Sequence, residues 1–396
     1  MTLSRLQVLF LMTSFPRTEG DVATPWAVEL IQRLAGRGVQ VTVCAPSYRG
    51  LRDHQVRGIP VMRFRYAPAA IEMLTHDSGA TNKLRRNPLY AALLPGYLLA
   101  GSQRVRQLCR EQRWDVVHIH WPMPQGILAL IGCPAGGPRL VSTFYGADLA
   151  LVRNLPLLKP LLRRIVARSD AISAISAYTA SELTRMSGAR PAIIPYGIDM
   201  TPLTAQDVGP KPAPVEILTV GRLIERKGHA VLIDAMAHIA RSRPDAVLTV
   251  IGEGHERPSL ERRIEQLGLQ AQVRLLGRVS EEELHRAYAR CDIFVLPSIV
   301  DRAGDTEGLG MVLLEAMRYE KPTVASALGG ITDIIEDGTT GLLVPPGDPV
   351  ALANAIERLL NAPALARQLG QAGRRINAER FAWDRVVDAY MGLYQP

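Results

Sequence analysis

The sequence predicts a two-domain α/β protein in which each domain holds a parallel β-sheet covered by helices. The chain has 396 residues, which suits two domains better than one ordinary core. Short apolar runs alternate with segments of helical spacing in both halves, as repeated βαβ units require. A stretch rich in Pro, Gly and Thr at 199–214 separates the halves and is expected to be a linker.

In the first half, apolar runs followed by turn residues indicate strands on either side of helical segments. A helix is expected over 26–35, since its apolar spacing is helical and glycines follow it. The apolar runs suit parallel strands that are covered on both faces. The expected strands are 8–13, 39–45, 115–120, 139–144 and 171–176.

The pattern restarts after the linker, so the second half is expected to repeat the architecture. Expected strands are 215–220, 246–251, 273–276, 293–297 and 322–326. Expected helices are 228–241, 256–267, 280–290, 310–319, 349–361 and 365–379. In sheets of this kind, ligands bind beyond the carboxyl ends of the strands.

Composition excludes several classes of protein. Hydrophobic residues make up 47% of the chain and charged residues 21%, which argues against intrinsic disorder. The cysteines form no CxxC pair and have no accompanying histidine cluster, so we expect neither a disulfide framework nor a zinc site. Residues 5–15 resemble a short signal peptide, but no small-residue cleavage site follows them, and we interpret them as a strand.

Positive charge is concentrated in the first half. Residues 1–200 hold 24 Lys and Arg against 12 Asp and Glu, whereas residues 201–396 hold 22 against 26. The first half is therefore expected to meet something anionic, for which nucleic acid, a membrane surface and a phosphorylated acceptor are candidates.

The segment 221–228, directly after the expected strand 215–220, indicates a diphosphate site. Its glycines permit a tight turn, the following helix N-terminus attracts anions, and Arg222 and Lys227 add two cations. The competing interpretation is an ordinary turn with solvated cations. The segment is neither GxGxxG nor a Walker loop, which disfavours nicotinamide dinucleotides and ATP.

A second motif places two carboxylates around a glycine-flanked helix start. Glu307 precedes Gly308, Leu309 and Gly310, and Glu315 follows within an otherwise apolar helix. Carboxylates accept hydrogen bonds from sugar hydroxyls, and backbone N–H groups at a helix start bind phosphate. One carboxylate could thus hold a sugar and the other a ribose, unless both are simply solvated charges.

Together these motifs resemble the retaining glycosyltransferases of family 4, which have the two-domain GT-B fold. The resemblance covers nearly the whole chain and depends on the order and spacing of several short segments. These segments are 219–223, 227–228, 251–254, 276–279, 296–298, 307–315, 329–330 and 337–341. It implies two Rossmann-like domains facing each other across a cleft, at 1–205 and 206–378. A final helical segment, 379–396, would return to the first domain.

The resemblance also implies a role for each matching residue, with a nucleotide-diphosphate sugar as co-substrate. Arg222 and Lys227 would bind the donor diphosphate, Glu307 the donor sugar and Glu315 the ribose. The backbone of Gly308, Leu309 and Gly310 would offer N–H groups to the donor. Arg278 and Val279 would flank the base, and Gly252 and Gly254 would allow close approach of the nucleotide. No DxD motif is present, so no metal is expected.

In the first half the match to the motifs of the family is less complete. His118 is expected to be a buried, hydrogen-bonded residue, and His120 a residue of the cleft. Tyr145 stands where family members commonly carry a His that faces the reacting sugar, and a phenol is a poor base at neutral pH. Gly20 and Asp148 would lie on the acceptor side.

Basic residues interleaved with apolar ones favour peripheral contact with an anionic membrane. One cluster lies between Lys83 and Arg113, with seven basic residues and several Leu and Tyr, and a second between Arg153 and Arg168. No nucleic-acid fold or motif is evident. By analogy with surface-glycan enzymes, the acceptor would be a glycan or polyprenyl-linked sugar at the cytoplasmic face of the plasma membrane.

The leading hypothesis is therefore a hexosyltransferase that uses a UDP- or GDP-sugar. The alternatives are a nucleotide-sugar epimerase or phosphorylase of the same fold, or a sugar-nucleotide sensor without catalysis. The sequence lacks the glycine fingerprint of a dinucleotide dehydrogenase, which disfavours that class of enzyme.

Overall fold

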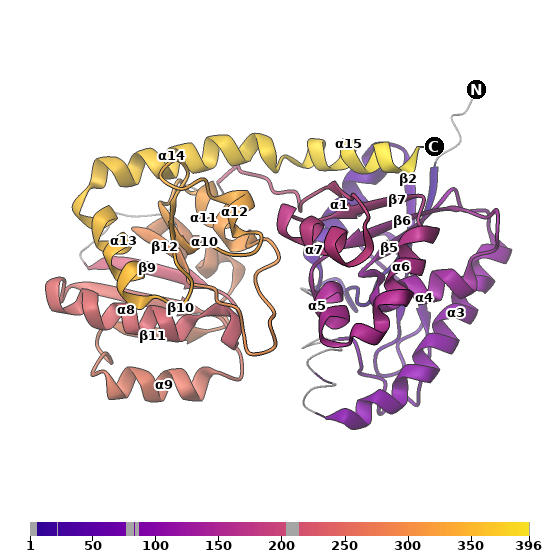
Figure 1. Ribbon diagram of the computed structural model, residues 1–396, viewed down its shortest axis with the longest axis horizontal. Helices are drawn as coiled ribbons and strands as arrows, with labels where there is room; N and C mark the ends of the chain where they lie inside the picture. The colour runs from indigo at the N-terminus through magenta and orange to yellow at the C-terminus, as the bar shows by residue number, and fades with distance from the viewer. Residues whose placement is uncertain (1–5, 22, 77–82, 84–86, 203–213, 396) are drawn as a thin grey trace. The chain divides into compact units, whose positions relative to one another are not determined.

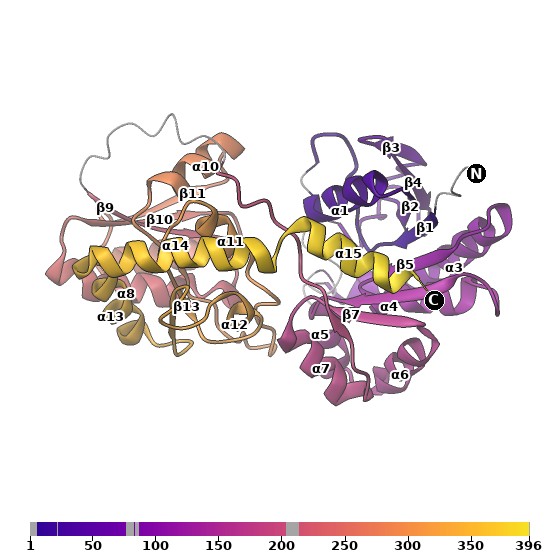
Figure 2. The same ribbon diagram turned by 90° about the horizontal axis from the view of Figure 1, so that it is seen from above.

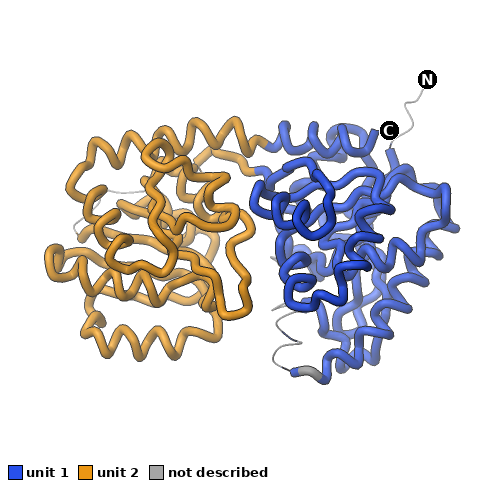
Figure 3. Tube along the Cα trace, in the orientation of Figure 1, with its two compact units in different colours: residues 1–197, 383–396 blue, residues 198–382 orange. Residues whose placement is uncertain are grey.

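Both halves of the chain fold around a parallel β-sheet, as the alternating pattern predicts (Figure 1). The computed structural model describes residues 6–21, 23–76, 83, 87–202 and 214–395. Unit 1 comprises residues 1–197 and 383–396, and unit 2 comprises residues 198–382 (Figure 3).

Unit 1 holds an eight-stranded sheet in the order β3-β4-β2-β1-β5-β6-β7-β8. All neighbouring strands are parallel except β3 and β4, which form an antiparallel hairpin that the sequence analysis did not predict. The strands are β1 (Leu6–Leu11), β2 (Val39–Pro46), β3 (His54–Val56), β4 (Ile59–Phe64), β5 (Val116–His120), β6 (Arg139–Phe144), β7 (Ala171–Ala174) and β8 (Ala192–Ile193).

Helices cover both faces of this sheet, so successive residues of β1 enter different cores. Val8 and Phe10 belong to the cluster that contains α1 and α15, whereas Leu9 and Leu11 pack with α3 and α4. The helices are α1 (Pro25–Gly36), η1 (Pro88–Leu93), α3 (Leu94–Glu111), α4 (Pro122–Gly132), α5 (Ala147–Asn154), η2 (Pro156–Leu158), α6 (Lys159–Arg168), α7 (Ala177–Ser187) and α15 (Trp383–Tyr394).

Unit 2 holds a fully parallel six-stranded sheet in the order β11-β10-β9-β12-β13-β14. Its strands are β9 (Val215–Val220), β10 (Ala246–Ile251), β11 (Val273–Gly277), β12 (Ile293–Leu296), β13 (Thr323–Ser326) and β14 (Leu342–Val344). Its helices are η3 (Glu225–Lys227), α8 (His229–Ser242), α9 (Arg257–Gln266), α10 (Glu281–Arg290), α11 (Met311–Arg318), α12 (Ile331–Ile334), α13 (Pro349–Asn361) and α14 (Pro363–Arg380).

Local capping explains several boundaries. Ser280 and Glu283 form a reciprocal capping box at the start of α10, and the Asp348 side chain accepts from the first backbone N–H groups of α13. Gly188 ends α7 in the left-handed conformation that glycine adopts at low cost.

The final helix, α15, belongs to unit 1 although it follows the whole of unit 2 (Figures 2 and 3). This confirms that the C-terminal helix crosses back. It begins at Trp383 and not at 379, because α14 continues to Arg380 and the backbone of Ala382 still pairs with Ile198. The expected boundary at 205/206 falls outside the described residues, and the units divide at 197/198.

Each sheet contains one point at which the chain reverses the direction of strand addition. In unit 1 it lies between β1 and β5, and in unit 2 between β9 and β12. The connections after these strands diverge to opposite sides, which leaves space for a ligand at their carboxyl ends. Among the helices of the described ranges, none is both long and apolar enough to cross a membrane.

Candidate functional site

In unit 2, a buried ion pair joins the two connections at the switch point between β9 and β12. Lys227 ends η3 after β9, and Glu307 lies in the loop after β12. The Lys227 Nζ atom donates to Glu307 Oε2 over 2.6 Å, and the two side chains are only 11% and 10% exposed. The structure therefore brings together two residues that the sequence places 80 positions apart.

Positive charge and hydrogen bonds keep Glu307 ionised despite its burial. Burial acts to raise the pKa of the Glu307 carboxyl, but the charges of Lys227 and Arg226 outweigh it. With the hydrogen bonds from Lys227 and Ser298, they lower the pKa to about 2. The Arg226 Nη1 atom also donates to the Thr306 carbonyl over 2.8 Å, which fixes the loop just before Glu307. Arg226 and Ser298 lie within the motif segments 221–228 and 296–298, but the sequence indicated no role for either residue.

Glycines pack the surrounding loops backbone against backbone. A Cβ atom at Gly252 would lie 1.9 Å from the Gly221 carbonyl oxygen, and one at Gly254 would lie 2.1 Å from that of Leu223. A Cβ at Gly330 would lie 2.1 Å from the Gly308 carbonyl oxygen. These glycines are thus required by close approach of the protein chain to itself, whereas the sequence analysis assigned Gly252 and Gly254 to approach of the nucleotide.

The backbone after Glu307 offers free donors at the start of α11. Gly310 caps this helix with a φ of 95°. Among the hydrogen bonds of the described residues, none is donated by the backbone N–H of Gly308, Leu309 or Gly310. Unsatisfied N–H groups at a helix N-terminus are suited to bind an anion.

The remaining predicted donor residues differ in how firmly they are held. Glu315 is half-buried and accepts a hydrogen bond of 2.7 Å from the buried Tyr288 hydroxyl, a partner that no sequence signal indicated. Arg222 and Arg278 have exposed side chains, and Val279 is half-buried. Because its side chain is exposed, Arg222 is accessible to a ligand.

One further buried histidine lies beside this loop. His229 follows Gly228 at the start of α8, and its Nε2 atom lies 3.2 Å from the Arg222 carbonyl oxygen. Burial lowers the pKa of His229 to about 4, so its imidazole is neutral near pH 7. Its place in the sequence, directly after the motif glycine Gly228, could have drawn attention to it.

In unit 1, His118 and His120 lie at the switch point between β1 and β5. Both are fully buried. As predicted, His118 is hydrogen-bonded: Nδ1 lies 2.8 Å from the Tyr394 hydroxyl of α15, and Nε2 lies 2.7 Å from Thr143 Oγ1. The Nδ1 atom of His120 lies 2.5 Å from the Tyr145 hydroxyl. Burial lowers the pKa of His120 to about 3.

Asp148 braces the turn that presents Tyr145. Its Oδ1 atom accepts from the backbone N–H groups of Tyr145 and Leu149, at 3.2 and 3.1 Å. Burial raises the pKa of Asp148 to about 7, although these hydrogen bonds act to lower it. The structure thus places Tyr145, His120 and Asp148 next to one another.

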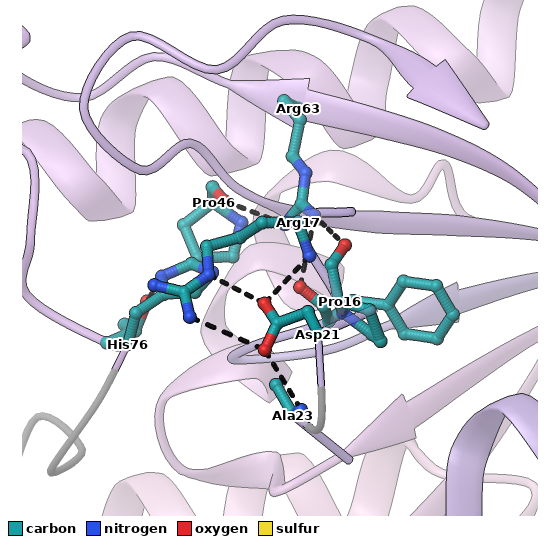
Figure 4. Close-up of polar contacts among 9 residues, drawn as sticks. Pro16, Arg17, Asp21, Ala23, Pro46, Arg63 and His76 are labelled. Atoms are coloured by element: carbon teal, nitrogen blue, oxygen red, sulfur yellow. Dashed lines mark hydrogen bonds and ion pairs between the residues drawn. The ribbon is translucent and has the colours of Figure 1, made fainter. Parts of the chain in front are cut away.

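The loop after β1, which contains Gly20, is braced by arginines (Figure 4). The buried Arg63 guanidinium donates to the carbonyls of Phe15, Pro16 and Pro46 at 3.1, 2.7 and 3.2 Å. Arg17 pairs with Asp21 at 2.6 Å. A Cβ atom at Gly20 would meet no atom within 4 Å, so the structure shows no steric need for glycine there.

Only part of the predicted basic and apolar surface of unit 1 is exposed to solvent. Tyr97 is fully buried against α4, whereas Leu89 and Leu99 are 79% and 62% exposed. Arg85 and Arg86 lie outside the described residues. In the second cluster, Leu157 is 94% exposed and the neighbouring Lys159, Arg163 and Arg164 are exposed as well.

No group of three or more His, Cys, Asp or Glu in the described ranges could hold a metal ion. The four cysteines carry free thiols.

Two family models together match most of the chain. The model for Glycosyltransferase Family 4 matches residues 25–201, and the model for Glycosyl transferases group 1 matches residues 203–376. A similar curated protein is a GDP-mannose-dependent alpha-(1-6)-phosphatidylinositol monomannoside mannosyltransferase of Mycolicibacterium smegmatis. It is 27% identical over 391 residues, which cover 95% of each chain.

Solved structures show the same fold. Sucrose-phosphate synthase from Thermosynechococcus elongatus superposes with a TM-score of 0.77 at 24% identity and covers 98% of both chains. HepE from Anabaena, solved in complex with UDP and glucose, superposes with a TM-score of 0.70 at 20% identity, again over 98% of both chains.

Proposed function

Since this chain belongs to glycosyltransferase family 4, we propose that it moves a hexosyl unit from a nucleotide-diphosphate sugar to a glycan or lipid-linked acceptor. That it is a glycosyltransferase with a GT-B fold follows from both family models and from the similar proteins. The observation that carries the proposal is the buried Lys227–Glu307 pair beside the free N–H groups of Gly308–Gly310.

This arrangement suits a donor with a sugar and two phosphates. A Lys ammonium has three donor hydrogens, so Lys227 can hold Glu307 and still bind a phosphate oxygen. Arg222, which is exposed, would grip the diphosphate from a second side. Glu307, kept ionised, would accept hydrogen bonds from the donor sugar, and Glu315, oriented by Tyr288, would accept them from the ribose. Arg278 and Val279 would flank the base.

We infer that catalysis relies on positioning and charge. Arg222 and Lys227 would neutralise the departing diphosphate, which makes a metal ion unnecessary. The reaction would retain the anomeric configuration, as the family does, with the donor phosphate taking the acceptor proton. Tyr145 and His120, which are hydrogen-bonded to each other, would orient the acceptor sugar. Gly20 and Asp148 would lie on the same side.

For the donor we favour GDP-mannose over UDP-sugars. The support is the similarity to a GDP-mannose-dependent mannosyltransferase over nearly the full length of both chains. The acceptor would be a sugar of surface polysaccharide biosynthesis, glycan-borne or polyprenyl-linked.

We further propose peripheral contact with anionic lipid at the inner face of the plasma membrane. The support is the exposed Leu157 next to exposed Lys159, Arg163 and Arg164 on η2 and α6. Binding to vesicles that contain anionic lipid should weaken with salt and fall in Arg163→Gln/Arg164→Gln. The matched control is Arg262→Gln/Arg274→Gln, which removes two exposed arginines from unit 2. Equal binding of both double variants would refute this surface.

The test of the function is release of nucleotide diphosphate from a panel of donors. The panel comprises GDP-mannose, UDP-glucose, UDP-galactose, UDP-N-acetylglucosamine and ADP-glucose, each with and without a mannose-terminated acceptor. We expect release from GDP-mannose that is lost in Arg222→Ala. Release that is equal in Arg222→Ala would contradict the proposed site, and release from a UDP-sugar alone would overturn the donor assignment.

A further inference from the structure

Two cysteines of unit 1 lie against each other, and the proposed function uses neither of them. Cys109 lies in the last turn of α3, and Cys133 directly follows the last residue of α4. A hydrogen bond joins the two thiols, with Cys133 donating and Cys109 accepting. Both residues are half-buried and so have surface in contact with solvent, whereas Cys44 and Cys291 are only 1% and 3% exposed.

Close packing of α3 on α4 places the two cysteines together (Figures 1 and 2). A Cβ atom at Gly132 would lie 2.7 Å from the Cβ atom of Val105, so the backbone of α4 touches α3 at this point. Cys133 directly follows Gly132 in the sequence, and Cys109 follows Val105 by four residues. Residues with this spacing share one face of a helix, so both cysteines lie just beyond the point of contact.

Hydrogen bonds fix the two helix ends that carry these cysteines. The Cys133 backbone N–H donates to the Ala129 carbonyl over 2.9 Å, which holds Cys133 at the end of α4. The Arg106 Nη2 atom donates to the Ile131 carbonyl over 3.0 Å and so ties the last turns of α3 to α4. A disulfide bond requires two cysteines whose backbones are held close together. The packing of α3 on α4 meets this requirement.

The thiols of unit 1 differ in reactivity. The hydrogen bond from Cys133 lowers the pKa of Cys109, whereas the pKa of Cys133 is raised, first by its hydrogen bond to Cys109 and then by burial. Because the thiolate is the form of cysteine that attacks a disulfide, Cys109 is the residue that reacts first. Burial raises the pKa of Cys44 to about 12, which keeps that thiol inert.

We propose that Cys109 and Cys133 are a redox modification site that reacts with a low-molecular-weight disulfide, such as oxidised glutathione, and closes into a reversible bridge between α3 and α4. The Cys109 thiolate attacks one sulfur of the oxidant, whose S–S bond breaks, and the departing glutathione thiolate takes a proton from water. Cys133 then gives its proton to water, attacks the Cys109 sulfur and expels the second glutathione. Two protein thiols are thereby oxidised, and one molecule of glutathione disulfide is reduced to two of glutathione.

The first step prepares the second. Once Cys109 is in the mixed disulfide, it no longer carries the thiolate that raised the pKa of Cys133. Reducing compartments keep such thiols free, so the bridge forms when the thiol pool around the protein becomes oxidised. The packing of α3 on α4 would then respond to oxidation, which is a property beyond the proposed transfer reaction.

The test is equilibration of the full chain in glutathione buffers of increasing oxidised fraction. After alkylation of the remaining thiols, mass spectrometry counts them and maps the bonded residues. We expect the wild type to lose two of its four thiols, with Cys109 and Cys133 linked within one polypeptide. The melting temperature should rise by about 5 °C on oxidation, because the bridge constrains the unfolded chain.

Matched variants separate the bridge from general thiol oxidation. Cys133→Ala should stop at a mixed disulfide between Cys109 and glutathione, and Cys109→Ala should form no bridge. Neither variant should gain melting temperature on oxidation. Cys44→Ala removes a buried thiol of the same unit and should form the bridge as the wild type does. Melting temperatures of the reduced variants identify loss of fold.

Three results would overturn the proposal. The first is retention of all four thiols at every buffer ratio. The second is a bridge that includes Cys44 or Cys291, or one that joins two polypeptides. The third is a wild type that carries separate glutathione adducts on Cys109 and Cys133, which would show that both thiols are accessible but do not meet.

Discussion

Lys227 and Glu307 form an ion pair of 2.6 Å between loops that follow different strands, and the side chains are almost fully buried. Such a pair links the position of the loop after β9 to that of the loop after β12. It also keeps the Glu307 carboxyl ionised at the point where we place the donor, because it lowers the pKa of that carboxyl. Its removal should therefore affect stability and donor binding together.

Replacement of Lys227 by Met should destabilise unit 2 by about 3–5 kcal/mol, because it leaves the Glu307 carboxylate buried without a counter-charge. The double variant Lys227→Met/Glu307→Gln should lose less than the sum of the single variants. Chemical denaturation measures the free energy of unfolding of the single and double variants. The matched control is Arg286→Met, which breaks an exposed helix pair with Glu282 and should cost about 0–1 kcal/mol. Additive losses in the double variant would show that the pair is not coupled.

The same pair should make the protein sensitive to acid. The folded pKa of Glu307 is about 2, below its ordinary value of 4.5, so the unfolded chain binds this proton more readily. The stabilisation is complete above about pH 4.5 and is lost as the pH falls toward about 2. Melting temperatures between pH 6 and pH 3 should fall more steeply in the wild type than in Lys227→Met/Glu307→Gln. Parallel curves would contradict the assignment.

Asp148 should have the opposite effect on the pH dependence of stability. Its folded pKa, about 7, lies above the ordinary value of 3.8, so the folded protein keeps a proton that the unfolded chain releases. Stability therefore decreases as the pH rises from about 4 to about 7. Asp148→Asn keeps the acceptor for Tyr145 and Leu149 but removes the titration, and should be the more stable protein at pH 8 by on the order of 4 kcal/mol. The difference in free energy of unfolding should vanish below pH 4, and a constant difference would refute this explanation.

The regular framework could be predicted from the sequence because it depends on local patterns. The bounds of β9, β10 and α13 agree with the prediction, because long apolar runs and Pro or Gly boundaries determine them locally. The hairpin β3–β4 was not predicted, since β3 has only three residues and lies at the sheet edge, while Pro60 and Arg63 interrupt the apolar run of β4. Glu307 and Arg222 were singled out through local glycine patterns, which need no knowledge of tertiary contacts, and their roles stay predictions.

Contacts that depend on the sheet order could not be predicted in this way. Trp26 and Trp121 are far apart in sequence and meet because they follow β1 and β5, which are neighbours in the sheet. The hydrogen bond between Tyr288 and Glu315 joins two helices in the same manner. The sequence identifies such residues as aromatic or acidic, but their partners follow only from the fold.

Replacing a glycine that close backbone contact requires should cost more stability than replacing a glycine that merely occupies a loop. Gly252→Ala should cost about 1–3 kcal/mol from backbone strain alone, because φ is 142° there and the new Cβ would lie 1.9 Å from the Gly221 carbonyl oxygen. Nucleotide affinity should fall as well, since the loop after β9 must move. Gly20→Ala has open space around it and should change stability by no more than about 0.5 kcal/mol. If Gly20→Ala lowers acceptor turnover at unchanged stability, Gly20 contributes to the acceptor side for a reason other than conformation.

Tyr288 should act on nucleotide binding without contacting the nucleotide. Its buried hydroxyl donates to Glu315 over 2.7 Å, and a hydrogen bond to a charged group contributes about 1.5–3 kcal/mol. Tyr288→Phe frees the Glu315 carboxylate from this orientation, so affinity for GDP should fall by about ten-fold if Glu315 binds the ribose.

The matched control is Tyr319→Phe. Tyr319 stacks on Tyr288 with ring centroids 6.1 Å apart, and its hydroxyl lies 2.9 Å from His285 Nδ1. Calorimetric titration of both variants with GDP separates the two roles. Loss of affinity in Tyr288→Phe alone places Glu315 at the ribose, because both variants remove one hydroxyl from the same aromatic stack. Unchanged affinity in Tyr288→Phe would mean that Glu315 serves the packing of α10 on α11 and does not contact the donor.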